Sequence, residues 1–567
     1  MALTQQHATA LQQLAQAHPR HAEITRLNRD FKRNYAAAQR AEREQAEQLA
    51  VVEQNQRQAE LAAAQAAQQQ ALRIDPWQLS EQAQSLEVAG DAQAARQLFA
   101  DLVATDPTTD AWFAYALLLE RQDDYAGARE LLAQVPLETW SEGMQALDQR
   151  ARDWLAADAA AQLAQQQQPL AQPELVSEQT REAELWIGWD HGSRNSTDGI
   201  SSLTTDTLLL RLTVPMQDDP DGEWFVQIDP IKASAGAADL DDSFWRERFG
   251  TGLICQQNCP TGIQPEANEQ GVAVGIGARS SDWYADIGLS PIGFERNTVV
   301  GGLGVTGDLG QFGVGAEIER RVLTSSLLNF ASINDPFSDR SWGLVTRNNL
   351  GFSASWDQGS GWGWWANAGM NWYRGHNVAN NQQWYAYSGL YSTVYDTEPL
   401  SIDVGLTALS WGFDNDQSQS TYGQGGYYSP RRYVSLSIPL TFYGRFERWS
   451  YRFRASLGKS DTQLAAAAFY PNNPELQQQA QLVAPQTGVE PVFAGGNGGG
   501  FGRSFNANVE YRIDTHWYVG FSAALQRSEF YDPDSFMLYF RYQFGGSSAP
   551  PRKPPLPPSR YVDEAWF

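Results

Sequence analysis

The sequence is short of cysteine, of positive charge and of long apolar runs. Lys and Arg total 41 in 567 residues against 66 Asp and Glu, which gives a formal net charge of −25. Such acidity argues against nucleic acid as a partner, because nucleic-acid recognition needs basic patches. No stretch approaches the roughly 18 consecutive apolar residues of a transmembrane helix. Any crossing of a membrane would therefore have to use strands.

Both cysteines, Cys255 and Cys259, fall in one long loop, and Pro260 and Gly262 follow them. We expect a disulfide that pins this loop, which is consistent with an oxidising compartment. A metal site is not favoured, because no histidine lies nearby to complete a set of ligands. The first six residues have neither the basic start nor the apolar core of a secretory signal. We therefore expect the chain to be the C-terminal part of a longer secreted protein.

Strict alternation of apolar and polar residues from Val434 to Leu457 is the clearest structural signal. Every second residue is apolar in 434–442 and again in 449–457, with polar residues between. Side chains on a strand point to opposite faces in turn, so each segment predicts a strand with one apolar and one polar face. Arg452 and Arg454 lie on the polar face, where a sandwich core would not accept them unpaired. A membrane barrel with lipid outside and water inside accepts them.

Segments with this alternation recur from Glu184 to Phe544. They predict an all-β transmembrane barrel of about 16 antiparallel strands, most with the roughly 9 to 11 residues that a tilted span needs. Aromatic residues at 12% and 48 glycines suit such a barrel with aromatic girdles. Short and long connections alternate, as in outer-membrane barrels, whose short turns are periplasmic and whose long loops are extracellular. The long connections are 233–269, 323–341, 410–431 and 460–502.

Residues opposite the apolar face of each strand should line an aqueous lumen, since a barrel of about sixteen strands leaves a channel. Sugars are neutral and hydroxyl-rich with apolar ring faces, so they suit aromatic platforms beside amide and carboxylate acceptors. For any single position, an ordinary lumen residue that only satisfies its neighbours is the simpler interpretation. The predicted substrate-channel residues are Arg211, Tyr284, Asp286, Glu317, Glu319, Arg347, Trp365, Asn367, Asn371, Tyr373, Asp403, Arg452, Arg454, Glu510, Arg512, Tyr518, Tyr539 and Arg541.

No motif for catalysis stands out. Glu317 and Glu319 could imitate the paired carboxylates of a glycosidase, but same-face neighbours on a strand are more simply lumen charges. The glycine runs 301–304 and 495–500 lack the surroundings of a phosphate-binding loop. We therefore expect no enzyme activity, no cofactor and no metal, and any transport must be powered elsewhere.

The amino-terminal part is predicted to be helical. Residues 1–75 are rich in Ala, Gln, Glu and Arg, which are strong helix formers, and Pro19 should separate a first helix from a longer second one. Residues 76–158 fit two tetratricopeptide-like units about 33 residues apart, a solenoid fragment that needs roughly three or more neighbours to bury a core. Such units present a concave surface to protein partners. Residues 159–183 are a predicted linker, 184–544 the barrel and 545–567 a Pro-rich periplasmic tail.

The tail leaves two interpretations open. Its prolines at 549–558 predict an extended polyproline II segment. The tail is then either disordered in the periplasm, or anchored by Tyr561, Trp566 and Phe567 to the periplasmic mouth of the barrel or to a partner. The strand before it, Met537–Phe544, ends in Phe and is similar to the signal that barrel-assembly machinery recognises.

Three unusual strings carry a resemblance to a known family: SPIGF at 290–294, TYGQGGYYSPRRYVSLSIP at 421–439, and residues 530–542. From about Pro76 to Phe567 the chain resembles the C-terminal part of the bacterial cellulose synthase outer-membrane subunit, cellulose synthase operon protein C. The resemblance implies a barrel in the cell outer membrane that exports nascent cellulose, a β-1,4-glucan. It also implies periplasmic repeats that contact other cellulose-synthase components or peptidoglycan. The expected partners are therefore the cellulose chain, outer-membrane lipid and those periplasmic components.

Two other functions stay open. One is export of another exopolysaccharide, such as a partly deacetylated amino-sugar polymer, which an acidic lumen would favour because that polymer is cationic. The other is a plugged outer-membrane scaffold or adhesin, which a permanently closed lumen would favour. For a channel of either kind, we expect the long loop 460–502, with its glycine run, to fold over the extracellular mouth as a gate.

Overall fold

The computed structural model describes residues 5–17, most of 23–40, 76–88, 92–151 except 123 and 142, 182–255 except 195, residues 259, 260 and 262, and 266–563 except 358, 360 and 528–532. The chain divides into two compact units, residues 1–79 and 80–567. In the first unit, α1 (Gln5–Ala17) is the predicted first helix. The longer second helix and the linker lie largely outside the described residues.

Residues 76–151 fold into successive helices, of which the second packs on the third and the third on the fourth. They are α3 (Pro76–Val88), α4 (Ala92–Thr105), α5 (Thr109–Arg121) and α6 (Tyr125–Leu132), followed by the 3-10 turn η1 (Leu137–Thr139) and a helix at 143–151. Ala83, Ala95 and Ala128 are fully buried, because small side chains let helices approach closely. Ala95 and Ala128 lie 33 residues apart, which agrees with the predicted repeat length, and assignment to a tetratricopeptide repeat stays a prediction. None of the described helices has both the length and the hydropathy needed to cross a membrane.

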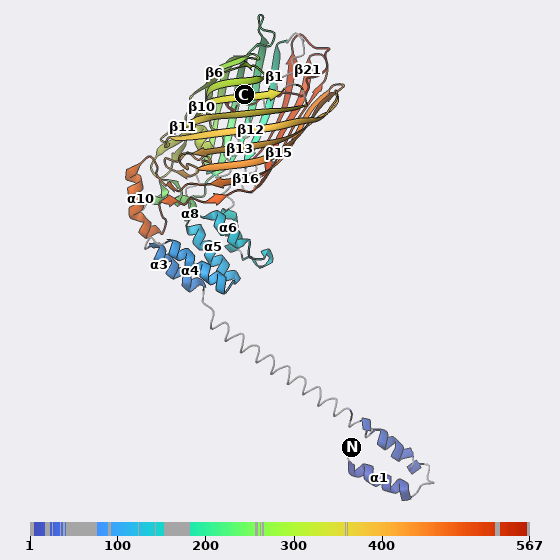
Figure 1. The fold of residues 1–567 in the computed structure, drawn as a ribbon. Coiled ribbons are helices and arrows are strands. Elements are labelled where there is room, and N and C mark those ends of the chain that lie inside the picture. Colours follow the sequence, from blue (N-terminus) through green and yellow to red (C-terminus); the bar gives the residue numbers. More distant parts are fainter. Residues whose placement is uncertain are drawn as a thin grey trace. The chain divides into compact units, whose positions relative to one another are not determined.

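Sixteen antiparallel strands form one closed barrel, because β1 pairs with both β2 and β22 (Figure 1). The predicted fold class is thereby confirmed. The strands are β1 (Glu184–Arg194), β2 (Leu203–Pro215), β3 (Glu223–Ala237), β5 (Glu266–Arg279), β6 (Trp283–Ile292), β7 (Val299–Leu309), β8 (Phe312–Val322), β10 (Arg340–Asp357), β11 (Trp362–His376), β12 (Asn381–Asp396), β13 (Ser401–Phe413), β15 (Arg432–Phe446), β16 (Trp449–Gln463), β20 (Phe501–Arg512), β21 (Trp517–Arg527) and β22 (Pro533–Gln543).

The outer face of the barrel is apolar. In β15 and β16 the outward residues include Leu436, Ile438 and Leu457, whose side chains are 53%, 58% and 68% exposed. The register pairs Ile438 with Leu457, so apolar residues meet across the strands on this face. Exposed apolar rows around a closed sheet are stable only against lipid, because water would not solvate them favourably. The barrel therefore spans a membrane.

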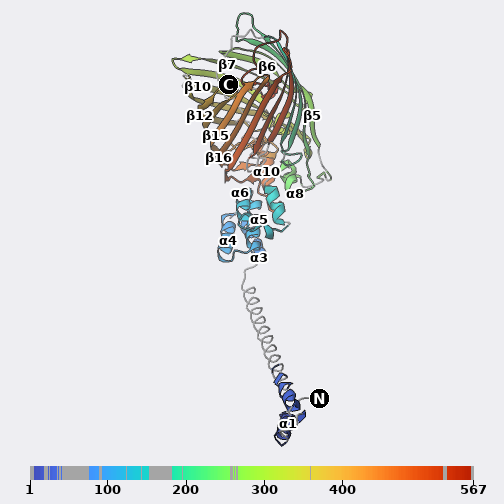
Figure 2. The same ribbon diagram turned by 90° about the vertical axis from the view of Figure 1, so that its right-hand side faces the viewer.

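Connections of two kinds separate the two rims of the barrel. Tight turns join strands at one rim, for example between β7 and β8 and between β15 and β16. Long loops join them at the other rim, where α8 and α10 also lie (Figure 2). The elements in these loops are α8 (Ser243–Glu247), β4 (Phe249–Gly250), η3 (Gly252–Ile254), α9 (Leu327–Ala331), β9 (Ile333–Asp335), β14 (Ser420–Thr421), β17 (Ala467–Ala468), α10 (Pro474–Thr487), β18 (Val492–Phe493) and β19 (Asn497–Gly498).

The long loops pack against one another in a loop cluster formed by residues 249–254, 327–342, 420–428 and 467–493. Phe249, Trp342 and Phe469 are buried in its apolar core. β4 pairs with β14, which joins two loops through backbone hydrogen bonds. Further hydrogen bonds run from Thr251 Oγ1 to Asp335 Oδ2 (2.6 Å), from Asn329 Nδ2 to the Gly426 carbonyl (3.1 Å) and from Gln424 Nε2 to the Ala468 carbonyl (2.8 Å). These loops thus form an ordered structure at one rim.

Candidate functional site in the barrel lumen

All eighteen predicted channel residues lie on the inner face of the barrel. The register sets several of them opposite one another across neighbouring strands, as in Arg347 with Tyr373, Arg512 with Tyr518, and Arg541 with Tyr518. Their side chains are buried or half-buried against other lumen groups. Most of them belong to two hydrogen-bonded networks, a pair of arginines or an aromatic wall. Of the others, Arg211 donates to Gln227, Asn371 and Tyr373 donate to Gln383, Asp403 accepts from Thr393, and Arg512 contacts the C-terminal tail. Their part in conducting a substrate is a proposal.

The first network joins β6, β8 and β10. Asp286 accepts two hydrogen bonds from Arg321, each 2.7 Å, in the fork geometry that favours an Arg–carboxylate pair. Arg321 also lies 3.6 Å from Glu319, which pairs with Arg347. Glu317 accepts from Tyr284 (3.3 Å) and Asn349 (2.8 Å). Both glutamates are therefore engaged by lumen partners, as expected for structural charges.

The second network joins β1, β20 and β22. Arg541 donates to Glu510 Oε2 (3.2 Å) and to Glu184 Oε1 (2.9 Å). Its guanidinium lies 3.7 Å from the Tyr518 ring centre, and Tyr539 donates to Glu510 (3.2 Å). The Arg541 side chain is only 3% exposed, so its charge is neutralised by two buried carboxylates. This network closes the barrel between its first and last strands.

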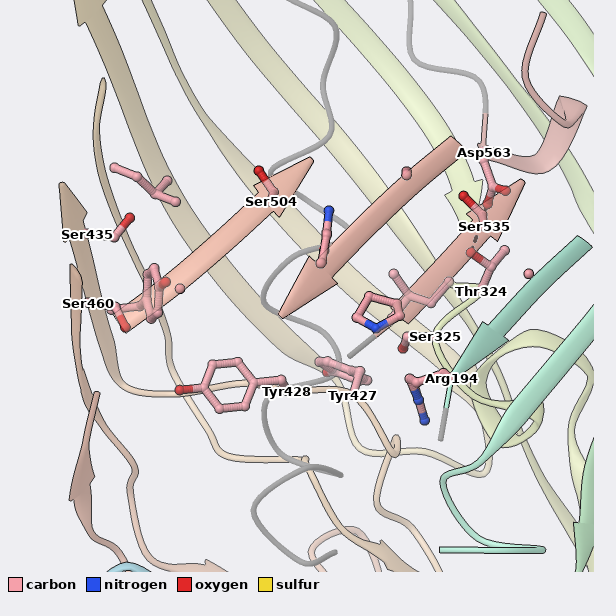
Figure 3. A pocket seen from close by; sticks show the side chains of 18 of the residues that line it. Arg194, Thr324, Ser325, Tyr427, Tyr428, Ser435, Ser460, Ser504, Ser535 and Asp563 are labelled. Carbon is pink, nitrogen blue, oxygen red and sulfur yellow. Dashed lines mark hydrogen bonds between the residues drawn. The ribbon is translucent and has the colours of Figure 1, made fainter. Parts of the chain in front are cut away.

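Arg452 and Arg454 differ from the other lumen arginines. They are neighbours on the inner face of β16, and within the described residues no hydrogen bond or ion pair holds either guanidinium. Both line a cavity of about 850 Å³ in the lumen. Ser435, Ser460 and Ser504 lie on one side of this cavity, and Thr324, Ser535 and Asp563 on the other, with Tyr427 and Tyr428 between them (Figure 3). The cavity wall is thus rich in hydroxyl groups and carries two guanidinium groups that form no ion pair among the described residues.

Aromatic rings form another part of this wall. A Cβ added at Gly389 would lie 2.6 Å from the Trp365 ring, so the indole lies against the glycine of the neighbouring strand. The absence of a side chain at Gly389 gives this ring room to lie along the wall. Tyr385 and Tyr387 are stacked with ring centres 5.0 Å apart, and Trp365, Asn367 and Tyr387 all line the cavity. Flat rings beside amides suit the apolar faces and hydroxyls of a sugar.

The C-terminal tail lies in the lumen over residues 549–563, so of the two interpretations the disordered one is wrong for this segment. Tyr561 does anchor the tail, but inside the barrel and not at its mouth. A polyproline segment has no internal hydrogen bonds, so its carbonyls need partners, and inward side chains supply them. Arg445 Nη1 donates to Pro551 O (3.0 Å), Gln227 Nε2 donates to Ser559 O (2.8 Å), and Arg512 donates to Ala549 O.

Basic side chains of the tail pair with acidic groups of the barrel. Arg552 lies 2.9 Å from Glu184, Lys553 lies 3.5 Å from Asp396, and Arg560 lies 3.8 Å from Asp190. Asp563 accepts a hydrogen bond of 2.8 Å from Thr324 Oγ1, which follows β8 at the long-loop rim. Because Ser547 N bonds to Thr515 O in a tight turn, the tail extends from one rim toward the other.

Tyr561 of η4 (Tyr561–Asp563) is the most deeply held residue of the tail. It is fully buried, its backbone N–H donates to Asp229 (2.7 Å), and its hydroxyl donates to Asp286 (2.7 Å). Its ring lies against Gly275 and Gly288, where an added Cβ would come within 2.2 and 2.3 Å of ring atoms. Two strand glycines therefore form a slot for this ring.

Two further features lie in the long loops: a disulfide, which the sequence predicts, and a buried aspartate, which it does not. Cys255 and Cys259 are joined by a disulfide in the 238–265 loop. Asp416, in the loop after β13, is buried and accepts hydrogen bonds of 2.9 and 2.6 Å from the Ser418 backbone N–H and hydroxyl. Burial raises the pKa of Asp416 to about 6, against the opposing effect of these hydrogen bonds. Its charge thus changes near neutral pH.

Sequence reasoning missed several lumen residues. Arg321 has the same parity as Glu317 and Glu319, so strand alternation alone could have identified it. Trp186 on β1 is buried beside Tyr539 and faces inward, whereas its neighbour Ile187 is 39% exposed on the outer face. The sequence gives only a weak indication of the tail contacts, because it places basic residues in the Pro-rich end of an otherwise acidic chain.

Together, the closed barrel, its apolar outer face and its polar lumen define a membrane-spanning β-barrel of the outer-membrane class. Residues 201–545 match the family model described as cellulose synthase operon protein C C-terminus. The chain belongs to this family.

Two curated relatives carry the name cellulose synthase operon protein C. The Escherichia coli (strain K12) protein is 32% identical over 377 residues, which are 66% of this chain and 32% of the relative. The Salmonella typhimurium protein is 30% identical over 380 residues, 66% of this chain and 31% of the relative. A third, cellulose synthase 2 operon protein C of Komagataeibacter xylinus, is 28% identical over 361 residues, 62% of this chain and 26% of the relative. The chain spans about a third or less of the length of these relatives.

Among solved structures, a bacterial polysaccharide outer membrane secretin aligns with 65% of this chain and 100% of its own chain, at 11% identity and a TM-score of 0.39. OmpT of Vibrio cholerae aligns with 65% of this chain and 100% of its own, at 9% identity and a TM-score of 0.26.

Proposed function

We propose that this barrel is the outer-membrane channel through which nascent cellulose passes from the periplasm to the cell surface. The observation that carries the proposal is the lumen cavity of about 850 Å³, whose wall combines hydroxyl, amide and guanidinium groups with Trp365 and Tyr387. A β-1,4-glucan is neutral, offers many hydroxyls and has apolar ring faces. The family membership supports this substrate, since the curated relatives are named for the cellulose synthase operon.

The two rims assign a direction to this channel. Outer-membrane barrels have short periplasmic turns and long extracellular loops. On this basis the tight turns and both ends of the barrel face the periplasm, and the loop cluster lies at the cell surface. The helical hairpins would act as a scaffold for cellulose-synthase components or peptidoglycan, as the family resemblance implies. Without a catalytic constellation or nucleotide loop in the sequence, the channel is passive, and polymer synthesis drives transport.

The structure corresponds to a closed state in this proposal. The tail fills part of the lumen and the loop cluster covers the rim of long loops, so a polymer passes only after both have moved. Residues 464–500 join β16 to β20 and contribute β17, α10, β18 and β19 to the cluster. This supports the role of the 460–502 loop as one part of a gate that includes three other loops.

The two alternative functions make different demands on the lumen. Export of a cationic polymer is disfavoured by Arg452 and Arg454, because guanidinium groups in the cavity wall repel positive charge. A permanently plugged scaffold agrees with the occupied lumen of the closed state. The scaffold hypothesis differs from the channel hypothesis because it predicts that the tail never leaves the lumen and the loops never uncover the rim.

The test is ion current through the barrel in a planar bilayer, recorded for the whole chain and for a variant that ends at Gly546. We expect the shortened variant to conduct, cello-oligosaccharides to block its current, and chitosan oligomers to block it less. Trp365→Ala should weaken the block by roughly two- to tenfold, since one aromatic contact is worth about 0.5 to 1.5 kcal/mol. Trp189→Ala is the matched control, because Trp189 is 45% exposed on the outer face. Preferential block by chitosan would instead indicate a cationic polymer.

A further inference from the structure

Charged side chains on the outward face of the described strands lie toward the rim of long loops, and they are mostly basic. The acidic ones have cationic partners: Asp206 lies 2.9 Å from His191, Asp461 lies 2.5 Å from Arg432, and Asp534 accepts from Arg527 at 2.8 Å. This basic surface belongs to a chain with a formal net charge of −25. The outward basic residues without such a carboxylate partner in the described part of the chain are Lys232, Arg320, Arg374, Lys459 and Arg503.

Arg320 and Arg374 come together on the wall formed by β8, β10 and β11. Arg320 on β8 pairs with Asn348 on β10, which pairs with Trp372 on β11. Arg374 follows Trp372 by two residues and so points to the same outer face. β10 lies between β8 and β11, so these two strands are roughly 10 Å apart at about 4.8 Å per step, and the two long side chains can reach one ligand between them.

The Arg320 guanidinium is held in place on this wall. Its Nε donates to the Val299 carbonyl (3.1 Å), Nη1 to Asn348 Oδ1 (2.9 Å) and Nη2 to Thr298 Oγ1 (3.3 Å). A guanidinium has five N–H donors, so these three hydrogen bonds leave two for a ligand. All three acceptors are neutral, which leaves the positive charge of Arg320 uncompensated by them.

Further positive charge surrounds this guanidinium. Arg374 is exposed, and within the described residues its side chain makes no hydrogen bond or ion pair. The charge of Arg374 repels that of Arg320. In the same way, the charge of Arg296 disfavours a positive charge on His376, which lies two residues beyond Arg374. Like charges held together on one face of a sheet are destabilising. A bound anion would relieve this repulsion.

The site lies where lipid headgroups are expected. Arg320 is eight residues along β8 from Phe312, which follows the tight turn at the opposite rim. With a rise of about 3.4 Å per residue and a tilt of about 40°, this corresponds to roughly 20 Å along the membrane normal. The apolar band of such barrels is about 25 Å tall with aromatic girdles at its edges. Trp372, between the two arginines in the register, fits such a girdle.

We propose that Arg320 and Arg374 form a binding site for the phosphate groups of the anionic glycolipid in the outer leaflet of the outer membrane. Arg forks bind phosphate oxygens in pairs, and this site offers two forks at headgroup depth. An acidic protein in a leaflet of anionic lipid needs such a surface, since its net charge is otherwise repelled. The site depends on the membrane embedding of the barrel and is independent of what passes through the lumen.

The experiment measures binding of purified lipopolysaccharide to the whole chain in detergent, with phosphorylated and enzymatically dephosphorylated lipid as probes. We expect the R320Q/R374Q variant to bind the phosphorylated lipid at least roughly tenfold more weakly, because two charge-assisted contacts are lost. The R320K/R374K variant keeps the charge and should retain part of the binding. The K232Q variant, which removes an exposed outward cation near the same rim, should bind like the unmodified chain.

Folding of each variant is checked by the shift in electrophoretic mobility on heating that intact barrels give. Equal binding of phosphorylated lipid by R320Q/R374Q and the unmodified chain would overturn the proposal. Equal binding of phosphorylated and dephosphorylated lipid by the unmodified chain would overturn it as well, because recognition would then rest on the acyl chains. Equal weakening by K232Q would show a diffuse effect of net charge in place of a site.

Discussion

Gly275→Ala should displace Tyr561 and so release the tail from the lumen. The three atoms nearest to an added Cβ at Gly275 all belong to the Tyr561 ring, at 2.2, 2.3 and 2.5 Å. These distances are shorter than any tolerable contact, so the ring must leave its slot. The strand itself accepts the change, because Gly275 does not have a positive φ. Gly288→Ala is less selective, because its Cβ would also lie 2.1 Å from the Val274 carbonyl.

The size of this effect follows from what Tyr561 loses. Overpacking a filled site costs about 1 to 3 kcal/mol. The hydrogen bond from the Tyr561 hydroxyl to Asp286 contributes about 1.5 to 3 kcal/mol, since its acceptor is charged. Together the docked tail should lose about 3 to 5 kcal/mol, which lowers the ratio of docked to released tail by a factor of roughly 100 to 5,000.

Tryptic cleavage after Arg560, followed by mass spectrometry, measures the released population. This bond is buried while the tail is docked, and cleavage follows the open population when reclosing is fast. Gly307→Ala is the control, since nothing lies within 4 Å of its added Cβ. The G275A/Y561A double variant should equal Y561A alone, because the collision then has no partner. Cleavage of G275A at the rate of G307A, or strictly additive effects in the double variant, would refute the docking of Tyr561 in this slot.

Three further predictions concern the lumen network and the loop cluster. Arg541→Ala should lower barrel stability by about 3 to 5 kcal/mol, seen as a lower temperature of heat-induced unfolding, because Glu510 loses its buried counter-charge; unchanged unfolding would contradict this network. The protection of residues 414–431 against hydrogen exchange, measured relative to the intrinsic exchange rate at each pH, should be greater at pH 5 than at pH 7.5. The raised pKa of Asp416, about 6, means that the packed loop gains stability as pH falls below 6, and this contribution is complete below about pH 4 and lost as pH rises through 6. Asp416→Asn should remove the difference, and a pH effect that survives this change would place the titrating group elsewhere. Replacing Cys255 and Cys259 by serine should expose the 238–265 loop to proteases while leaving barrel unfolding unchanged, because the disulfide lies within that loop alone.

The strands and the inner face could be predicted because their signal is local. Alternation with period two is written into each segment, as in Val434–Phe442, and it fixes which side chains share a face once one residue is known to face lipid. Arg452 and Arg454 were placed in the lumen on this ground alone. Which inward residues touch depends on the register between strands, and the sequence does not determine that register. The pairing of Glu184 with Arg541, 357 residues apart, is an example.

The tail and the loop cluster could not be predicted because their contacts are distant in sequence and lack a repeating pattern. Tyr561 bonds to Asp229, which lies 332 residues earlier. Its slot needs glycines on two strands, and each glycine alone resembles any other in a Gly-rich barrel. The prolines at 549–558 predict an extended segment, and the segment is extended in the structure. The sequence did not reveal that lumen side chains would satisfy its carbonyls.

Passage of sugar through the barrel tests the central claim most directly. Liposomes that hold radiolabelled cellohexaose or a deacetylated chitohexaose would contain either the whole chain or the variant that ends at Gly546, and release of label would be followed with time. We predict little release through the whole chain, rapid release of cellohexaose through the shortened variant, and slower release of the cationic sugar because of Arg452 and Arg454. Retention of cellohexaose by the shortened variant, or faster release of the cationic sugar, would contradict a channel for β-1,4-glucan.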